Sequence, residues 1–173
     1  MTFISYQKGR FIVKVLAFDP SGNFNEGKGT SGWCTSIDNQ GHVLGDIDSK
    51  DYSSREDYWF AHRTLVERKF PDVLVIESYK LFGNKAMSQA GSSLETPQLI
   101  GYLQMVAHEL NIPVVLQDPS TKTRHSDPVL TATGTITKHG IQYYFKGEKT
   151  NMHKRDALRH NMYFCKYGKK VKK

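Results

Sequence analysis

Hydrophobic residues along the chain follow two patterns, one typical of strands and one typical of helices. Three strand-like segments open the sequence, at residues 10–19, 30–38 and 42–48, and short polar connections separate them. Two later runs, residues 72–77 (DVLVIE) and 112–117 (IPVVLQ), are almost entirely apolar. Such runs are typical of parallel strands buried on both faces, so we expect five strands in all.

Helical patterns lie between and after the last two strands. Ser53 and Ser54 precede two acids with capping-box spacing, which predicts a helix to about Lys69. Thr96 and Pro97 predict an N-cap and a first helical residue, and the apolar positions that follow on one face of that helix are Leu99, Leu103, Val106 and Leu110. Asn151 predicts the cap of a last helix that reaches about Tyr167.

The order of these elements predicts one α/β domain spanning residues 1–173. Three strands with short connections should form an antiparallel unit, and the strand–helix–strand crossovers that follow should add parallel strands. We therefore expect a mixed five-stranded sheet flanked by helices. Residues 118–147 are rich in Thr and Gly and are predicted to be irregular, and residues 166–173 form a short basic tail.

The charge of the chain favours a polyanionic partner. The net charge is +7 with a pI near 9.3, which points first to nucleic acid and second to an anionic membrane surface. No apolar run approaches the roughly 20 residues needed to span a bilayer, and residues 1–10 lack the features of a signal peptide. We expect a cytoplasmic protein with no membrane partner. The two cysteines, Cys34 and Cys165, form no metal-binding pair and are interpreted as structural.

Three acidic residues occur where an α/β sheet places functional groups. Asp19 ends the first strand, Glu77 ends the first apolar strand, and Asp156 lies near the start of the last helix, three residues after His153. Ligands of such sheets collect at the carboxyl ends of the strands, so these carboxylates could converge. Each has an ordinary alternative: Asp19 can start a turn before Pro20, and Asp156 suits a helix N-terminus. Glu77 is harder to explain in that way, because Glu is rarely buried.

A cluster of three carboxylates suits phosphodiester hydrolysis. Two divalent ions about 3.5–4 Å apart can activate a water molecule and stabilise the leaving oxyanion. Mg²⁺ prefers oxygen ligands and keeps several waters, so three or four protein ligands suffice for it. The sequence therefore predicts a metal-dependent nuclease.

Five short motifs occur in an order that resembles the RuvC family of Holliday junction resolvases. They are FDPSG around Asp19, VIE ending at Glu77, QLIG at residues 98–101, PSTK at residues 119–122, and HKRDAL around Asp156. The segments KAMSQAGSSLETPQLIG and PVVLQDPSTKTR bring the sequence closer still to the short RuvC-like resolvases of bacteriophages. The resemblance spans roughly residues 13–163.

This resemblance implies a ribonuclease H-like fold, a homodimer, and paired nicks across a four-way DNA junction. Asp19, Glu77 and Asp156 would be ligands of two Mg²⁺ ions, and His153 would take the fourth ligand position. An imidazole there suits Mn²⁺ as a substitute metal. Alternatively, His153 would orient or protonate a phosphate oxygen. A phage origin would place the protein in the cytoplasm of a bacterial host.

The DNA-contacting positions depart in part from the family pattern. An aromatic residue is expected three positions beyond the strand Glu, and Lys80 stands there instead, flanked by Tyr79 and Phe82. Either aromatic side chain could stack on an unpaired base or pack in the core. The residues interpreted as phosphate contacts, each of which could equally be an ordinary solvated side chain, are Lys80, Lys85, Lys122 and Arg124.

Other functions are compatible with parts of the same sequence pattern. Residues 22–28 match the start of a P-loop, but Gly29 replaces the required Ser or Thr and a strand follows, so no nucleotide cofactor is expected. An endonuclease for RNA–DNA hybrids or flaps would use the same fold and metals. A non-catalytic nucleic-acid-binding protein would retain the fold without the chemistry. An actin-like phosphotransferase, which also begins with a strand Asp and a glycine loop, is a more remote alternative, because 173 residues are few for its two lobes.

Overall fold

The computed structural model describes residues 13–24, 27–80 and 94–168. Its centre is a five-stranded sheet with the strand order β3-β2-β1-β4-β5. Strands β1 and β2 pair antiparallel, as do β2 and β3, whereas β4 runs parallel to both β1 and β5. The predicted mixed sheet is confirmed, and its strands are β1 (Lys14–Asp19), β2 (Thr30–Ile37), β3 (Gln40–Asp48), β4 (Val73–Glu77) and β5 (Val114–Gln117).

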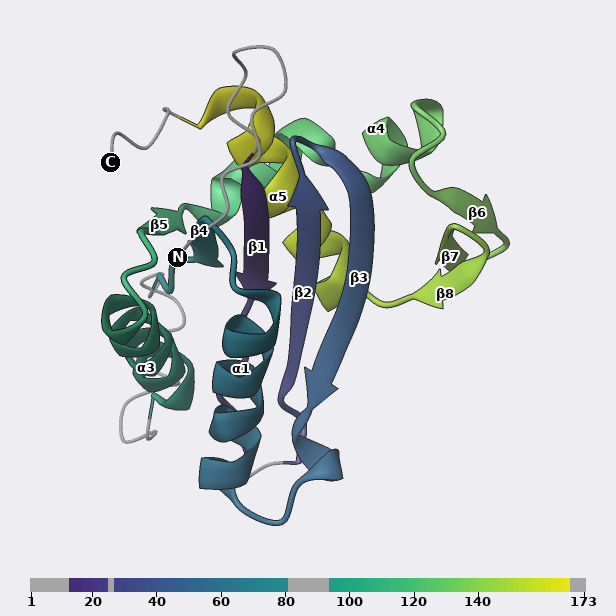
Figure 1. The fold of residues 1–173 in the computed structure, drawn as a ribbon. Coiled ribbons are helices and arrows are strands. Elements are labelled where there is room, and N and C mark those ends of the chain that lie inside the picture. The colour runs from purple at the N-terminus through teal and green to yellow at the C-terminus, as the bar shows by residue number, and fades with distance from the viewer. Residues whose placement is uncertain (1–12, 25–26, 81–93, 169–173) are drawn as a thin grey trace.

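Helices lie on both sides of this sheet (Figure 1). Two of them, α1 (Arg55–Lys69) and α3 (Glu95–Glu109), lie on one side, and α5 (Met152–Tyr167) lies on the other. The Ser54 hydroxyl accepts a hydrogen bond from the Asp57 N–H, and the Asn151 side chain accepts one from the Lys154 N–H. The predicted caps of the first and last helices are thus confirmed.

Alternate residues of the central strands face the two helical layers. Leu16 and Phe18 of β1 lie in the core cluster shared with α1 and α3. The even-numbered residues of β4, Leu74 and Ile76, lie in the same cluster. Val15 and Ala17 lie instead in a cluster with Phe164 of α5, together with the odd-numbered residues of β4. Because strand side chains alternate between faces, every odd position of β1 and β4 points toward α5. This parity decides where the acids at the ends of these strands point.

Residues 118–147 are not irregular, contrary to the prediction. A short 3₁₀ segment η2 (Pro119–His125) and helix α4 (Asp127–Ala132) come first. A second sheet follows, built from β6 (Thr137–His139), β7 (Gln142–Phe145) and β8 (Glu148–Thr150). Elements of three to seven residues are too short to show a hydrophobic period. They are stabilised by packing on α5, where Leu130 and Ile136 join Leu158 in one buried cluster.

The prediction that the strand ending at Gln117 is buried on both faces is wrong. β5 is the last strand of the sheet, and the side chain of Leu116 is 48% exposed. An apolar run cannot distinguish a central strand from an edge strand, because both need residues that favour extended backbone.

Thr96 is not the N-cap of α3, contrary to the prediction. The helix begins at Glu95, after Leu94 in the left-handed conformation with a φ of 49°. The Thr96 hydroxyl accepts a hydrogen bond from the Gly22 N–H at 3.0 Å instead. A side chain that binds a distant loop is unavailable to its own helix, and sequence-local capping rules do not include that competition. The predicted apolar face is confirmed, because Leu99, Leu103 and Val106 are all buried.

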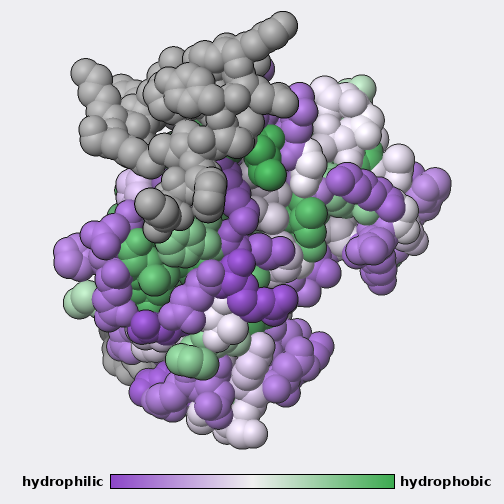
Figure 2. Space-filling model, viewed as in Figure 1, coloured by the Kyte–Doolittle hydropathy of each residue, from purple (hydrophilic) through white to green (hydrophobic). Residues whose placement is uncertain are grey.

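Hydrophilic side chains cover much of the surface seen in Figure 2, with apolar patches among them. Large exposed apolar side chains include Phe60 of α1 and Met105 of α3, which are 58% and 59% exposed. None of the helices in the described part of the chain is long and apolar enough to cross a membrane.

His62 of α1 should make stability depend on pH. Its side chain is fully buried, and burial lowers its pKa from 6.5 to about 4. Below about pH 6.5 the unfolded chain binds a proton that the folded chain excludes, so stability is lost as the pH falls toward 4. The total loss is about 3 kcal/mol at about 1.4 kcal/mol per pKa unit. The free energy of unfolding would be measured by urea denaturation at neutral pH and near pH 5. Its decrease between the two pH values should be smaller in His62→Leu than in the unchanged protein. An equal decrease in both proteins would contradict this assignment.

Candidate metal centre

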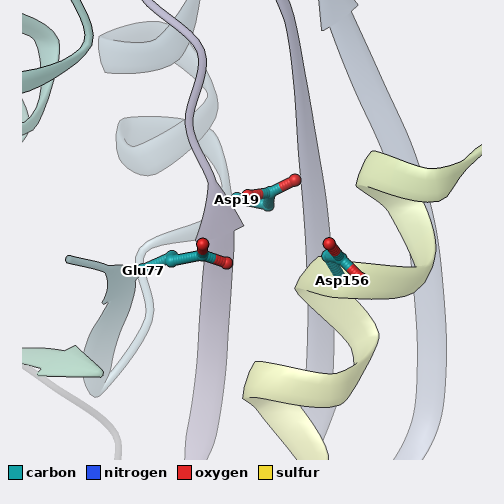
Figure 3. A group of neighbouring side chains, drawn as sticks. All are labelled: Asp19, Glu77 and Asp156. Carbon is teal, nitrogen blue, oxygen red and sulfur yellow. The ribbon is translucent and has the colours of Figure 1, made fainter. Parts of the chain in front are cut away.

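The structure brings Asp19, Glu77 and Asp156 together (Figure 3). One carboxylate oxygen from each residue lies within 4.8 Å of the others. Asp19 and Glu77 are the last residues of β1 and β4, two parallel neighbours in which Phe18 pairs with Ile76. Both acids occupy odd positions, so both side chains point to the face that α5 covers, where Asp156 meets them.

Helix α5 approaches the sheet closely because β2 has a glycine at the crossing point. Gly32 pairs with Asp19, and a Cβ atom on Gly32 would lie 2.0 Å from the backbone oxygen of His153. Farther along α5, Asn161 accepts a hydrogen bond from the Ser36 hydroxyl at 2.6 Å and donates one to the Cys34 carbonyl. These contacts fix the position of α5 on β2 and therefore the position of Asp156.

Basic side chains lie directly against the acid cluster. The Lys122 ammonium lies 2.8 Å from Glu77 Oε2 and 2.7 Å from Asp156 Oδ2. The other oxygen of Asp156 accepts a hydrogen bond from Arg159, which also pairs with Asp127 of α4. Lys122 therefore neutralises Glu77 and Asp156 from within the cluster, and Arg159 fixes the orientation of the Asp156 carboxylate from its other oxygen.

His153 contacts the cluster through Asp19. Its Nδ1 atom lies 2.8 Å from Asp19 Oδ2, and its side chain is 34% exposed. The hydrogen bond to Asp19 raises the pKa of His153, although partial burial opposes this. The structure thus places all four residues predicted to form the site in one group, with His153 at its outer, more exposed edge.

Asp19 and Glu77 differ in their electrostatic environments. Burial raises the pKa of Asp19 above its ordinary value, and the neighbouring Glu77 adds to this, while the hydrogen bond with His153 opposes it. Burial also acts to raise the pKa of Glu77, but hydrogen bonds from His160 and Lys122 outweigh it and bring that pKa below its ordinary value. The partners of Glu77 therefore stabilise its anionic form. The single hydrogen bond with His153 does not offset the effect of burial on the pKa of Asp19.

Three residues beside the cluster were not predicted from the sequence. Arg159 and His160 of α5 bind acids of the cluster, and Gln117 of β5 binds His160. His160 Nε2 lies 2.7 Å from Glu77 Oε2, and its Nδ1 lies 2.7 Å from Gln117 Oε1. A signal was present, since Arg159 and His160 follow Asp156 by three and four residues and so share its helical face.

The residues predicted to contact DNA lie in different surroundings. Lys80 forms an ion pair with Asp118, and the Arg124 guanidinium lies 5.2 Å from the ring centroid of Tyr167. Lys122 lies inside the acid cluster rather than on an open rim. Tyr79 is partly buried against the main core. The remaining two predicted contacts, Phe82 and Lys85, lie outside the described residues.

The donor atoms of this cluster fit a hard divalent cation. The three carboxylates supply oxygen ligands, the type that Mg²⁺ prefers, and their separation allows one ion to contact more than one of them. The Lys122 ammonium already lies between two of these acids, so the positive charge of a metal ion would be compensated at the same place. His153 at the edge adds a nitrogen donor of the type that Mn²⁺ also accepts.

Comparison with solved structures identifies the architecture. RuvC of T. thermophilus in complex with a Holliday junction substrate aligns with a TM-score of 0.60 and 14% sequence identity, over 90% of this chain and 94% of that one. A second T. thermophilus RuvC structure aligns with a TM-score of 0.55 and 13% identity, over 90% and 96% of the two chains. This chain has the RuvC-like fold.

The likeness to RuvC extends over the fold but leaves little overall sequence identity. No model of a protein family matches the sequence, and no curated protein matches it either. At 13–14% identity, most side chains differ between this chain and the two RuvC structures.

Proposed function

We propose that this protein is a metal-dependent endodeoxyribonuclease that resolves four-way and other branched DNA junctions by paired nicks. The observation that carries the proposal is the convergence of Asp19, Glu77 and Asp156 within 4.8 Å at the carboxyl ends of parallel strands. These residues, with His153 as a fourth ligand, would hold two Mg²⁺ ions, for which Mn²⁺ could substitute. When bound, such ions supply an activated water and stabilise the charge on the leaving oxygen.

The side chains around the acids have separate tasks in this proposal. Asp19 and Glu77 would orient the attacking water from the rigid ends of β1 and β4. Lys122 would contact a phosphate oxygen with its ammonium group, because that group already lies at the centre of the site. His153, the most exposed of the four, would either complete the ligand set or donate a proton to a phosphate oxygen.

DNA is the substrate class that the charge and the fold favour. The net charge of +7 suits a polyanion, and a T. thermophilus RuvC of this fold has been solved with a Holliday junction substrate. Lys80, Lys85 and Arg124 would contact phosphates on the arms beside the site, and Tyr79 or Phe82 would stack on an unpaired base.

Paired nicks require two active sites on one junction, so we propose a homodimer. The exposed apolar side chains Phe60 and Met105, on α1 and α3, are candidates for burial in its interface. Two copies related by a two-fold axis would place equivalent sites on opposite strands.

A substrate comparison tests the proposal directly. A synthetic immobile four-way junction should be nicked symmetrically and at least tenfold faster than a linear duplex or an RNA–DNA hybrid of the same arm sequence, because only the junction fits a pair of sites. Cleavage products would be resolved on denaturing gels with Mg²⁺, with Mn²⁺, and with chelator alone.

Each alternative makes its own prediction in this assay. Faster cleavage of the hybrid would instead identify an RNA–DNA nuclease of the same fold. Junction binding without cleavage in either metal would identify a non-catalytic binding protein. Single, unpaired nicks would contradict the homodimer.

A further inference from the structure

We propose that His160 is a positioning residue that fixes the carboxylate of Glu77 for metal binding. This inference rests on the proposed function and concerns how the same site is held in shape. His160 touches no predicted substrate atom. It acts through Glu77, to which it is hydrogen bonded, and through Gln117, which fixes its ring from the other side.

One imidazole spans the ends of two neighbouring strands. Glu77 and Gln117 are the last residues of β4 and β5, and they pair directly in the parallel register. His160 Nε2 lies 2.7 Å from Glu77 Oε2, and Nδ1 lies 2.7 Å from Gln117 Oε1 and 3.4 Å from Thr121 Oγ1. The ring is therefore held at both nitrogens, and it cannot rotate without breaking contacts on both strands.

The direction of the hydrogen bond to Glu77 is determined by chemistry. An ionised carboxylate can only accept, so Nε2 carries the hydrogen and donates it. Nδ1 then accepts, and its donor in the Gln117 side chain is the amide NH₂ group, which a half-turn of the amide places at the position of Oε1. Glu77 Oε2 then accepts from two donors, His160 on the inner side and Lys122 on the other. Holding one oxygen in this way fixes the rotation of the whole carboxylate and thus the direction of Oε1.

Burial makes this arrangement rigid. The His160 side chain is fully buried, whereas the side chain of Lys122 is 21% exposed and long enough to move. If Lys122 leaves Glu77 when a metal or a phosphate enters, the hydrogen bond from His160 remains. Partners that orient metal ligands in this way typically change metal affinity or activity by about 10–100-fold when they are removed.

A second buried histidine provides a matched control. His62 is also fully buried, but it lies on α1, on the opposite side of the sheet. Its Nδ1 atom bonds to the Tyr58 carbonyl at 2.8 Å, and its ring packs against Phe18 and Tyr58. A change from His to Leu therefore removes the same buried imidazole at both sites, but only at His160 does it remove a donor to an acid of the cluster.

The experiment compares His160→Leu, His160→Gln and His62→Leu in the full chain near pH 8. Binding of Mn²⁺ in the absence of DNA would be titrated by electron paramagnetic resonance, and junction nicking and thermal unfolding would be measured on the same samples. We expect His160→Leu to weaken Mn²⁺ binding about tenfold and to lower the nicking rate at saturating DNA by about 10–100-fold. His160→Gln, which keeps an N–H donor, should recover most of both losses, and His62→Leu should change neither.

The outcomes separate this inference from the proposed function. If the unchanged protein binds Mn²⁺ and nicks junctions but His160→Leu does both equally well, the positioning role is wrong and the nuclease stands. Equal losses in His160→Leu and His62→Leu, in step with equal losses of thermal stability, would also overturn it, since the effect would then be structural. An unchanged protein that neither binds Mn²⁺ nor nicks any DNA would overturn the proposed function and this role with it.

Discussion

Replacing Asp19 by Asn, or Glu77 by Gln, is expected to lower the rate of junction nicking about a thousandfold while leaving junction binding within a few-fold. Each change removes one anionic ligand from a cluster of three and keeps the shape of the side chain. A thousandfold loss is about 4 kcal/mol of transition-state stabilisation, the size expected when a charged group that acts directly on the reaction is lost. Asp156→Asn should act in the same direction and weaken divalent-ion binding as well.

Binding should survive these substitutions for an electrostatic reason. Each one makes the chain more positive, and contacts with phosphates dominate affinity for DNA. The readouts are single-turnover nicking of a labelled junction and gel-shift titration in chelator. Glu109→Gln is a matched control, because Glu109 is an exposed acid at the end of α3. An unchanged nicking rate in Asp19→Asn or Glu77→Gln would contradict a catalytic role for the acid cluster.

Replacing Lys122 by Met is expected to destabilise the metal-free protein by about 2 kcal/mol, and divalent ions should restore the loss. The ammonium group lies against both Glu77 and Asp156, so its removal leaves partly buried carboxylates without their partner. Breaking a fully buried pair costs about 3–5 kcal/mol, and the partial exposure of Lys122 reduces this. A divalent ion at about 100 times its Kd stabilises the folded state by about 2.7 kcal/mol.

The measurement is urea denaturation near neutral pH with chelator and with Mn²⁺. The variant should gain more stability from Mn²⁺ than the unchanged protein does, because in the unchanged protein the ion competes with Lys122. Lys50→Met serves as the control, since Lys50 pairs with Asp48 on the surface. The free energy of unfolding of this variant should equal that of the unchanged protein, both with chelator and with Mn²⁺. An identical response to Mn²⁺ in Lys122→Met and the unchanged protein would show that Lys122 does not occupy the metal position.

The strands and helices with clear periodicity were predictable from local sequence. Three residues illustrate this: Ser54 and Asn151 cap α1 and α5 as predicted, and Glu77 ends an apolar strand. Short elements were not predictable in this way. Strands β6, β7 and β8 have three or four residues each and form because β7 packs Tyr143 and Phe145 against the cluster on α5.

The acids of the site were predictable as candidates, but their immediate partners were not. An Asp or Glu at the end of an apolar strand stands out locally, because an ionised group there needs a compensating partner. Nothing local marks Lys122 as that partner for Glu77, because a Lys in a polar segment is usually a solvated surface residue. His160 and Gln117 are likewise ordinary in sequence, and they become notable only when α5 lies against the ends of β4 and β5.

Local sequence is sufficient to place Asp19, Glu77 and Asp156 at the ends of strands and a helix, with His153 one turn before Asp156. Whether these acids meet depends on how the strands and α5 pack together. Side chains of a strand alternate in direction, so an acid at a strand end points to one face or the other depending on a single residue of register. Asp19 and Glu77 share the face that α5 covers, and Gly32 lets α5 approach closely enough for Asp156 to join them.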